Sequence, residues 1–503
     1  MKYNNKMILS ALFCSLMLST TACSDDNTPQ PDEQAPVISV EGDVHALTTT
    51  ASRTFDLTPS GISFSTKDNM SPRTVRIDRS TKYQEIDGFG AAITGSTAYN
   101  LLKMEPEART AFLKKTFSTT EGYGMSYIRI CIGCSDFSLS EYTCCDTEGI
   151  ENFALTSEET QYVIPVLKEI LAINPDIKIM GSPWTAPLWM KVSDLSTLSP
   201  CNSWTGGYLN PAHYGDYAQY FVKWIKAFAD NGIRIHAVTL QNEPLNRGNS
   251  ASMFMGWQQQ RDFVKVVGPA FEQAGITTKI YAFDHNYNYD NMADQDKYPC
   301  KIYADAEASK YLAGAAYHNY GGSPDELNAV HSAFPDKELI FTESTAGDWN
   351  DGSNLAGRFI AGATFAVIAD AQDITLGTVS RWSRGAIIWN LMLDAQRGPN
   401  RPGGCTNGFG AVDIDKNYSH IRYNSFYHNM AHMSAVIAPG AHRVASSGYT
   451  ANGLMYEAFE NPDGTLAAVI CNADAEAVNL TLDDGTHHFL VPVPGRSVVS
   501  LKW

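Results

Sequence analysis

The stretch NPAHYGDYAQYFVKWIKAFADNGIRIHAVTLQNEP, residues 210–244, predicts one helix followed by one strand. Apolar residues recur at helical spacing as far as Gly232, which favours an amphipathic helix over 210–232. The strand RIHAVTLQN follows, and Glu243 and Pro244 stand at its end. A proline removes a backbone donor and so stops a strand. On its own Asn-Glu-Pro could be only a strand cap, so its meaning depends on the rest of the chain.

Strands and helices continue to alternate on both sides of this stretch. Most of the expected strands carry polar or aromatic residues at their C-terminal ends, as the eight-fold β/α barrel does. A doubly wound parallel sheet is the alternative, but no Gly-x-Gly-x-x-Gly follows the first strand. The fold class is therefore α/β, a (β/α)8 TIM barrel. The other elements expected are strands at 176–184, 278–286, 313–320, 337–345 and 385–393 and a helix at 255–275.

The chain changes character after about residue 435. Short alternating runs are separated by Asn-Gly, Asp-Gly and Pro-Gly turns, a pattern typical of an antiparallel β-sandwich. Residues around 45–85 have the same pattern, so we expect them to join that sandwich. The predicted division is 1–22 signal peptide, 23–45 flexible tether, 46–85 N-terminal sandwich strands, 86–432 catalytic barrel and 433–503 C-terminal β-sandwich.

The N-terminus has the features of an export signal. Lys2 and Lys6 precede an apolar run that is too short to span a bilayer. Cys23 follows Ala22 as the lipidated cysteine does in a bacterial lipoprotein, although Thr20 is atypical of such sites. The sequence predicts an exported protein anchored through Cys23 at the outer membrane or cell surface, with periplasmic or free secretion as the alternative.

Composition narrows the class of partner. Of 503 residues, 44% are hydrophobic, which is typical of a globular protein with a large core. The formal net charge of −17 argues against nucleic acid, which needs clustered Lys and Arg. The aromatic content of 11% suits sugar faces as well as cores. A neutral ligand fits best.

The cysteines do not predict a metal site. Cys14 and Cys23 belong to the signal region, which leaves eight of the ten. Four of these crowd between residues 131 and 145, but no second pair with zinc spacing follows. Disulfides or buried thiols are expected instead. We expect no metal and no cofactor.

A second carboxylate, like Glu243, stands at the end of a predicted strand. Glu343 ends the strand KELIFTE, and 343 − 243 = 100 residues accommodate three βα units. The two glutamates would then end strands four and seven and face each other across the barrel mouth. Such a pair suits glycoside cleavage, and a gap of about 5–5.5 Å gives retention of configuration. Asn242 is placed to hydrogen-bond a sugar 2-OH.

Six motifs in order resemble glycoside hydrolase family 30, the glucosylceramidase-like family of retaining enzymes built on β/α barrels. The resemblance runs from about residue 85 to the C-terminus, and FYHNMAHMSAVIAPGAHRV (426–444) resembles that family's passage into its side domain. The motifs are DGFGAAITGSTA (87–98), YIRICIGCSDFS (127–138), GSPWTAPLWMK (181–191), QNEP (241–244), FTEST (341–345) and IIWNLML (387–393).

The resemblance implies a role for each matching residue. Glu243 becomes the general acid/base and Glu343 the nucleophile, with Arg129 as the buried arginine that keeps the nucleophile ionised. Five further residues correspond to sugar-binding positions, although the tryptophans could be core residues and the histidine structural. They are Asp136, Trp184, His318, Tyr320 and Trp389, with His285 and Asn286 as candidates that line the cleft from further out.

The expected function is that of a retaining glycoside hydrolase acting on a β-linked glucan. Exported bacterial and fungal members of the family point to an endo-β-1,6-glucanase acting on pustulan-type glucan. Glucosylceramidase or β-glucosidase activity is the alternative. Xylanase activity is less well supported, with Arg397 and Arg401 as the residues that could bind a uronate. A non-catalytic glycan-binding surface lipoprotein would be expected to have lost one carboxylate.

Overall fold

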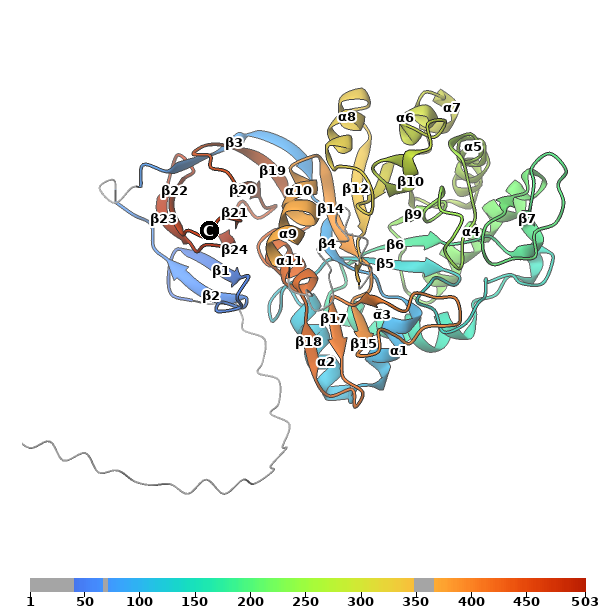
Figure 1. The fold of residues 1–503 in the computed structure, drawn as a ribbon, viewed down its shortest axis with the longest axis horizontal. Helices are drawn as coiled ribbons and strands as arrows, with labels where there is room; N and C mark the ends of the chain where they lie inside the picture. The colour runs from blue at the N-terminus through green and yellow to red at the C-terminus, as the bar shows by residue number, and fades with distance from the viewer. Residues whose placement is uncertain (1–39, 67–70, 348–365) are drawn as a thin grey trace, which may run out of the picture.

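The computed structural model describes residues 40–66, 71–347 and 366–503 (Figure 1). The expected signal peptide, Cys23 and most of the expected tether lie outside the described residues. The described chain forms a barrel and a sandwich that lie side by side (Figure 1).

Eight parallel strands form the barrel. Their order is β4-β14-β12-β11-β10-β9-β6-β5, and a parallel bridge between Ala92 and Arg129 closes the ring. Because the sheet closes on itself, the doubly wound alternative is wrong. The barrel strands are β4 (Gly88–Ala91), β5 (Tyr127–Ile132), β6 (Lys178–Pro183), β9 (Ala237–Thr239), β10 (Lys279–Asn286), β11 (Gly314–His318), β12 (Glu338–Glu343) and β14 (Ser383–Ile388).

Side chains that point inward fill the barrel. One buried cluster takes a residue from each of seven strands, as the packed layers of a TIM barrel do. This layer makes the barrel a solid support whose interior is filled by side chains. Its members are Tyr127, Met180, Ala237, Tyr281, Ala316, Ile340 and Ile387.

Helices join successive strands. The opening stretch of the sequence supplies α4, a helix of 17 residues that buries one apolar face. The helices are α1 (Gly95–Lys103), α2 (Pro106–Phe117), α3 (Ile164–Ile173), α4 (Tyr214–Asp230), α5 (Trp257–Ala274), α6 (Tyr298–Tyr303), α7 (Ala306–Ser309), α8 (Asp325–Ala333), α9 (Val367–Asp370), α10 (Leu376–Val379) and α11 (Ser425–Ser434).

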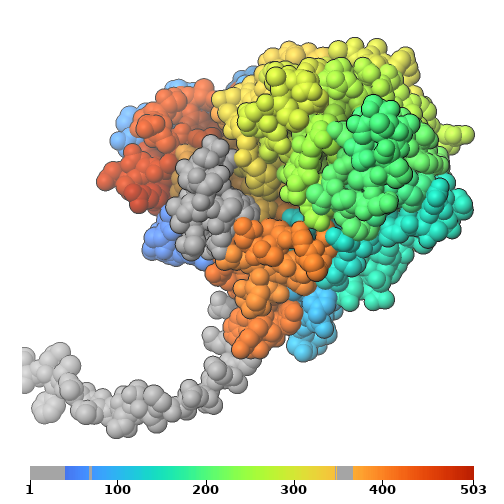
Figure 2. Space-filling view, turned by 45° about the vertical axis from the view of Figure 1, so that its right-hand side comes forward, coloured from blue at the N-terminus to red at the C-terminus, as the bar shows by residue number. Residues whose placement is uncertain are grey.

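The sandwich combines both ends of the described chain. Its nine strands run in the order β2-β1-β24-β21-β20-β19-β3-β22-β23. Figure 2 shows the blue N-terminal strands and the red C-terminal strands gathered on one side of the molecule. The strands are β1 (Val44–Thr50), β2 (Thr58–Ile62), β3 (Thr74–Glu85), β19 (His442–Gly448), β20 (Leu454–Glu460), β21 (Leu466–Asn472), β22 (Val478–Asp483), β23 (His488–Val493) and β24 (Ser497–Lys502).

Helix α11 joins the two parts. All ten of its residues are buried, and it contacts both β4 of the barrel and β24 of the sandwich. His432 lies within hydrogen-bond distance, 2.8 Å, of both Ser500 Oγ and Thr49 Oγ1 in the sandwich. The expected boundary at residue 432 therefore falls within a shared helix, and the first strand after it begins at His442.

Short strand pairs arrange the loops at the mouth. β13 (Ala346–Gly347), just after Glu343, pairs with β16 (Gly408–Phe409). The remaining short strands are β7 (Lys191–Val192), β8 (Tyr208–Leu209), β15 (Met392–Asp394), β17 (Val412–Ile414) and β18 (Ile421–Tyr423).

Candidate active site

The two glutamates stand at the ends of strands four and seven, as the spacing predicted. Glu343 is the last residue of β12, and Glu243 lies four residues beyond the end of β9. Glu243 has a φ of 44°, and its N–H donates to the Asp284 carbonyl at 3.0 Å. A positive φ is uncommon for a residue with a side chain and is found where the surroundings enforce it.

The two carboxylates face each other at short range. One oxygen of each lies within 4.8 Å of the other, and the exposed fractions of Glu243 and Glu343 are 6% and 5%. This separation fits the retaining reaction, since inverting enzymes need about 6.5–9.5 Å for a water between the carboxyls. Both line a cleft of about 450 Å³, together with Asp136, Tyr320 and Trp389 among others.

Arg129 is hydrogen-bonded to three polar residues of the site. It is fully buried on β5, and its Nη1 donates to Glu343 Oε2 at 2.6 Å. Its Nη2 donates to Asn242 Oδ1 at 2.6 Å and to Asp284 Oδ2 at 2.8 Å. Because a guanidinium only donates, it fixes the orientation of the Asn242 amide and turns its N–H groups away from Arg129. One cation therefore holds both the candidate nucleophile and the candidate sugar-binding amide.

Asp284 lies at the centre of this hydrogen-bond network, and the sequence pattern did not predict its role. It is fully buried on β10 and accepts from Thr239 Oγ1 and Thr342 Oγ1, each at 2.6 Å. Burial alone would raise the pKa of Asp284, but Arg129 and His318 lower it well below its ordinary value. A lone aspartate within an apolar strand pattern is a usable signal, because a buried charge must be paired.

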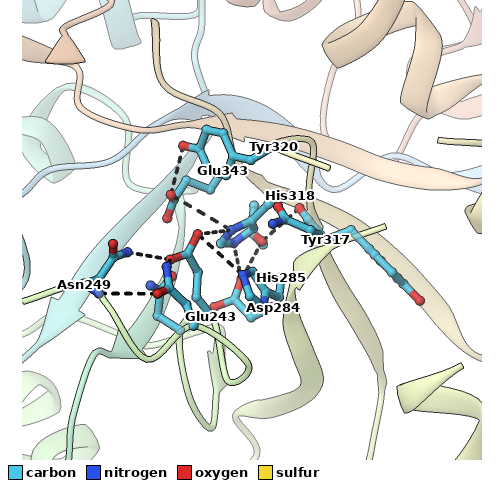
Figure 3. A network of polar contacts seen from close by, with 12 residues as sticks. Glu243, Asn249, Asp284, His285, Tyr317, His318, Tyr320 and Glu343 are labelled. Carbon is cyan, nitrogen blue, oxygen red and sulfur yellow. Dashed lines mark hydrogen bonds and ion pairs between the residues drawn. The ribbon is translucent and has the colours of Figure 1, made fainter. Parts of the chain in front are cut away.

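His318 lies between three carboxylates, as Figure 3 shows. Its Nε2 is 3.0 Å from Asp284 Oδ1, and its Nδ1 is 3.7 Å from Glu243 Oε1 and 4.0 Å from Glu343 Oε1. Burial alone would lower the pKa of His318, but Glu343, Asp284 and Glu243 raise it to about 9. Tyr320, two residues later, donates to Glu343 Oε1 at 3.0 Å.

The two glutamates and His318 shift one another's pKa values. Burial and the charge of Glu243 hold the pKa of Glu343 above its ordinary value, although His318 and Arg129 lower it. Burial alone would raise the pKa of Glu243, but His318, His285 and the Asn246 amide hold it below its ordinary value. Since each group alters the others, an observed pKa belongs to the cluster and not to one residue.

Asp136 also lines the cleft. Its Oδ1 is shielded from solvent and has no hydrogen-bond partner in the described part of the chain. Burial raises the pKa of Asp136 to about 8, helped by the charges of Glu343 and Glu243. A shielded acceptor without a partner suits a sugar hydroxyl.

The two tryptophans form one stack with different exposures to the cleft. Their ring centroids are 4.8 Å apart, and Arg129 lies within 5.3 Å of both rings. Trp389 lines the cleft, whereas Trp184 packs behind it. The sequence did not distinguish these positions.

The arginines weighed for a uronate serve the loops. Arg401 is 3% exposed and donates to the Ser135 carbonyl at 3.1 Å and to Glu141 at 3.1 Å. Arg397 lies over the Phe409 ring at 4.4 Å. Neither is among the residues that line the cleft.

The eight cysteines outside the signal region were expected to be disulfides or buried thiols. Cysteines 131, 134, 144, 145, 201, 300, 405 and 471 are all free thiols, so the expectation of buried thiols fits better than that of disulfides. Among the residues that the structure describes, Glu243, His318 and Glu343 are the set with metal-site spacing, their ligand atoms lying within 4.8 Å of one another. They have donors that a divalent ion accepts.

Comparison with known proteins agrees with this geometry. Residues 86–437 match the family model of the glycosyl hydrolase family 30 TIM-barrel domain, and residues 440–501 match that of its beta sandwich domain. The solved structure of the endo-beta1,6-glucanase BT3312 is 57% identical with a TM-score of 0.87, covering 92% of this chain and 99% of that one.

Curated relatives include both endo-1,6-beta-D-glucanases and glucosylceramidases. The endo-1,6-beta-D-glucanase BGN16.3 of Trichoderma harzianum is 33% identical over 84% of this chain and 85% of its own length. The lysosomal acid glucosylceramidase of Mus musculus is 31% identical over 84% of this chain and 82% of its own length.

Proposed function

Because the chain belongs to glycosyl hydrolase family 30, we propose that it is an endo-β-1,6-glucanase that retains anomeric configuration. The observation that carries the chemistry is the pair of buried carboxylates within 4.8 Å at the ends of strands four and seven. The 57% identity to an endo-β-1,6-glucanase structure supports the linkage.

In the first step Glu343 attacks the anomeric carbon and a glycosyl-enzyme forms. Arg129 holds the attacking carboxylate at 2.6 Å and favours its ionised form. Glu243 gives its proton to the glycosidic oxygen as the bond to the leaving sugar breaks. Asn242, with its amide oriented by Arg129, donates to the 2-OH, a contact that tightens in the transition state.

In the second step Glu243 acts as a base. It removes a proton from water, the water oxygen bonds to the anomeric carbon, and Glu343 leaves as a carboxylate. The two inversions together retain configuration. Tyr320, which donates to Glu343 Oε1 at 3.0 Å, stabilises the departing carboxylate.

The sugar on the non-reducing side binds between Asp136 and Trp389. Asp136 offers an acceptor without a protein partner, and Trp389 offers an aromatic surface in the cleft wall. Trp184 supports the ring of Trp389 from behind.

Glucosylceramidase activity is the second candidate, favoured by the 31% identity to the mouse enzyme. The uronate-dependent xylanase is disfavoured because neither Arg397 nor Arg401 is among the residues that line the cleft. A non-catalytic glycan-binding protein would not need both carboxylates, and both are present.

Export and lipid anchoring are part of the proposal. Lys2, Lys6, the apolar run and Cys23 carry it, and a polymeric glucan is a substrate met outside the cytoplasm. None of the helices in the described part of the chain is long and apolar enough to cross a membrane.

The test compares hydrolysis of pustulan, glucuronoxylan and an aryl β-glucoside. We expect oligosaccharides from pustulan, with retained configuration observed by NMR during early turnover. Products from xylan alone would overturn the linkage. Absence of product from every β-glycoside would overturn the proposed function.

A further inference from the structure

The loop after Glu243 carries two amides that no part of the mechanism above uses. Asn246 Nδ2 donates to Glu243 Oε2 at 2.8 Å, and Asn249 Nδ2 donates to the same oxygen at 2.6 Å. Figure 3 shows Asn249 on one side of the Glu243 carboxyl and His318 on the other. Both donors lie in the loop that directly follows Glu243.

The orientation of the Asn246 amide follows from the backbone. The N–H groups of Gly248 and Asn249 donate to Asn246 Oδ1, at 2.8 and 3.3 Å. Its other terminal atom must therefore be the NH₂ group, which points at Glu243. The loop itself starts with a turn in which the Asn246 N–H donates to the Glu243 carbonyl at 2.9 Å.

The two oxygens of Glu243 are thus unequal. Oε2 accepts two N–H donors, which together occupy both of its lone-pair directions. A proton on Oε2 would have to displace one of these donors. Oε1 instead has imidazole nitrogens at 3.7 Å (His318) and 3.8 Å (His285), beyond hydrogen-bond distance.

We propose that Asn246 and Asn249 are positioning residues that confine the exchangeable proton of Glu243 to Oε1. The same pair stabilises the Glu243 carboxylate that must act as base in the second step. The inference rests on the proposed acid/base role of Glu243. It adds residues that set where the proton is carried and how readily it leaves.

Other charges surround Glu243, and the test must hold them constant. The charged and titratable groups are Arg129 from β5, Asp284 and His285 from β10, His318 from β11, Glu343 from β12, Asp136 at the cleft and the neutral hydroxyl of Tyr320. None of these is altered by substitution at the two asparagines. A shift between variant and wild type therefore reports the amides.

The experiment measures pH profiles of kcat/KM for Asn249→Ala and Asn246→Asp. Removing a donor to the charged form raises the pKa of the acid, so the basic limb moves up by about one pH unit for Asn249→Ala. Asn246→Asp keeps the Oδ1 that accepts from the backbone but replaces the donor by a negative charge, so the limb should move further. We expect kcat to fall about tenfold in each, because the proton is no longer held on Oε1.

The control is Asn407→Ala. Asn407 lines the same cleft and accepts from Cys405 Sγ at 3.4 Å, and within the described chain no hydrogen bond joins it to either glutamate. Both limbs should stay in place in this variant. Thermal melts check that each protein is folded.

The outcomes separate the two proposals. Profiles are measured on whichever β-glycoside the wild type hydrolyses, so failure on pustulan overturns the linkage and leaves this test intact. If no substrate is cleaved, infrared titration of the carboxyl stretches, with Glu243→Gln to assign the Glu243 band, gives the same comparison. Unmoved limbs with a lower kcat, or a basic limb that moves down, would overturn the role of the asparagines.

Discussion

The substitution Arg129→Lys tests whether Arg129 positions the groups of the site through its hydrogen bonds or only fills the space between them. The guanidinium makes contacts to Glu343, Asn242 and Asp284 at 2.6–2.8 Å with two nitrogens, and a lysine has one. A lysine near Asp284 would leave the contacts to Glu343 and Asn242 unmade. Each hydrogen bond with a charged partner is worth about 1.5–3 kcal/mol, so about 3–6 kcal/mol of interaction is lost.

This loss divides between folding and catalysis. We expect kcat/KM to fall about 10²-fold or more, since about 1.4 kcal/mol corresponds to tenfold. The free energy of unfolding should fall by about 2–4 kcal/mol, because Glu343 stays buried with a weaker partner. Steady-state kinetics on pustulan and denaturant melts measure the two parts.

A matched control lies at the other end of the barrel. Arg384 pairs with Asp87 at 2.8 Å and is mostly buried, but it lies at the start of β14, away from the mouth. Arg384→Lys should lower stability and leave kcat/KM within about threefold of wild type. If Arg129→Lys retained kcat/KM within tenfold while Arg384→Lys did not, the positioning argument would be refuted.

Three further predictions follow from the same residues. Glu343→Gln should reduce turnover by about 10⁴-fold or more. Glu243→Ala should keep activity on an aryl glycoside with an acidic leaving group and should regain rate when azide is added. If azide rescued only the Glu343 variant, the two roles would be reversed. Asp136→Asn should raise the melting temperature at pH 7 and match wild type near pH 3.5. The folded pKa of Asp136, about 8, lies above the unfolded value, so its contribution to stability is full below about pH 4 and is lost as pH rises through 8; an unchanged difference between the two pH values would contradict this. Zn²⁺ should inhibit competitively and EDTA should reverse it, because Glu243, His318 and Glu343 offer ligand atoms within 4.8 Å; purely noncompetitive inhibition would place the ion elsewhere.

The barrel was predictable because its signals are local and repeated. Each expected strand was found within a few residues, since continuous apolar runs ending in polar residues mark buried parallel strands. The pairing of Glu243 with Glu343 followed from counting βα units. The shared helix α11 was less predictable, because a helix buried on all sides shows no stripe that assigns it to one domain.

Asp284 escaped prediction because the strand that carries it is irregular. The register of β10 against β11 shifts between Phe283 and His285, and both Phe283 and Asp284 have positive φ. A strict period of two cannot say which side chain points inward across such a bulge. The sequence pattern therefore predicted His285 and Asn286, at the strand end, as cleft residues and did not predict Asp284, the residue that binds Arg129.

The same cause explains why the asparagine pair was missed and why these residues occur together. Glu243 lies past the end of β9 with a φ of 44°, so its side chain is aimed by the loop and by Asp284, not by strand geometry. Glu343 is the last residue of its strand, so counting βα units was enough to place it at the barrel mouth. Where a loop aims a side chain, the partners must come from the loop, and residues 246–249 supply them. The nucleophile is thus held from the barrel floor by Arg129 and the acid/base from the rim. Because neither Asn246 nor Asn249 is hydrogen-bonded to Arg129 in the described part of the chain, the pKa of the acid can be altered by substitution in the loop while the contact between Arg129 and Glu343 stays intact.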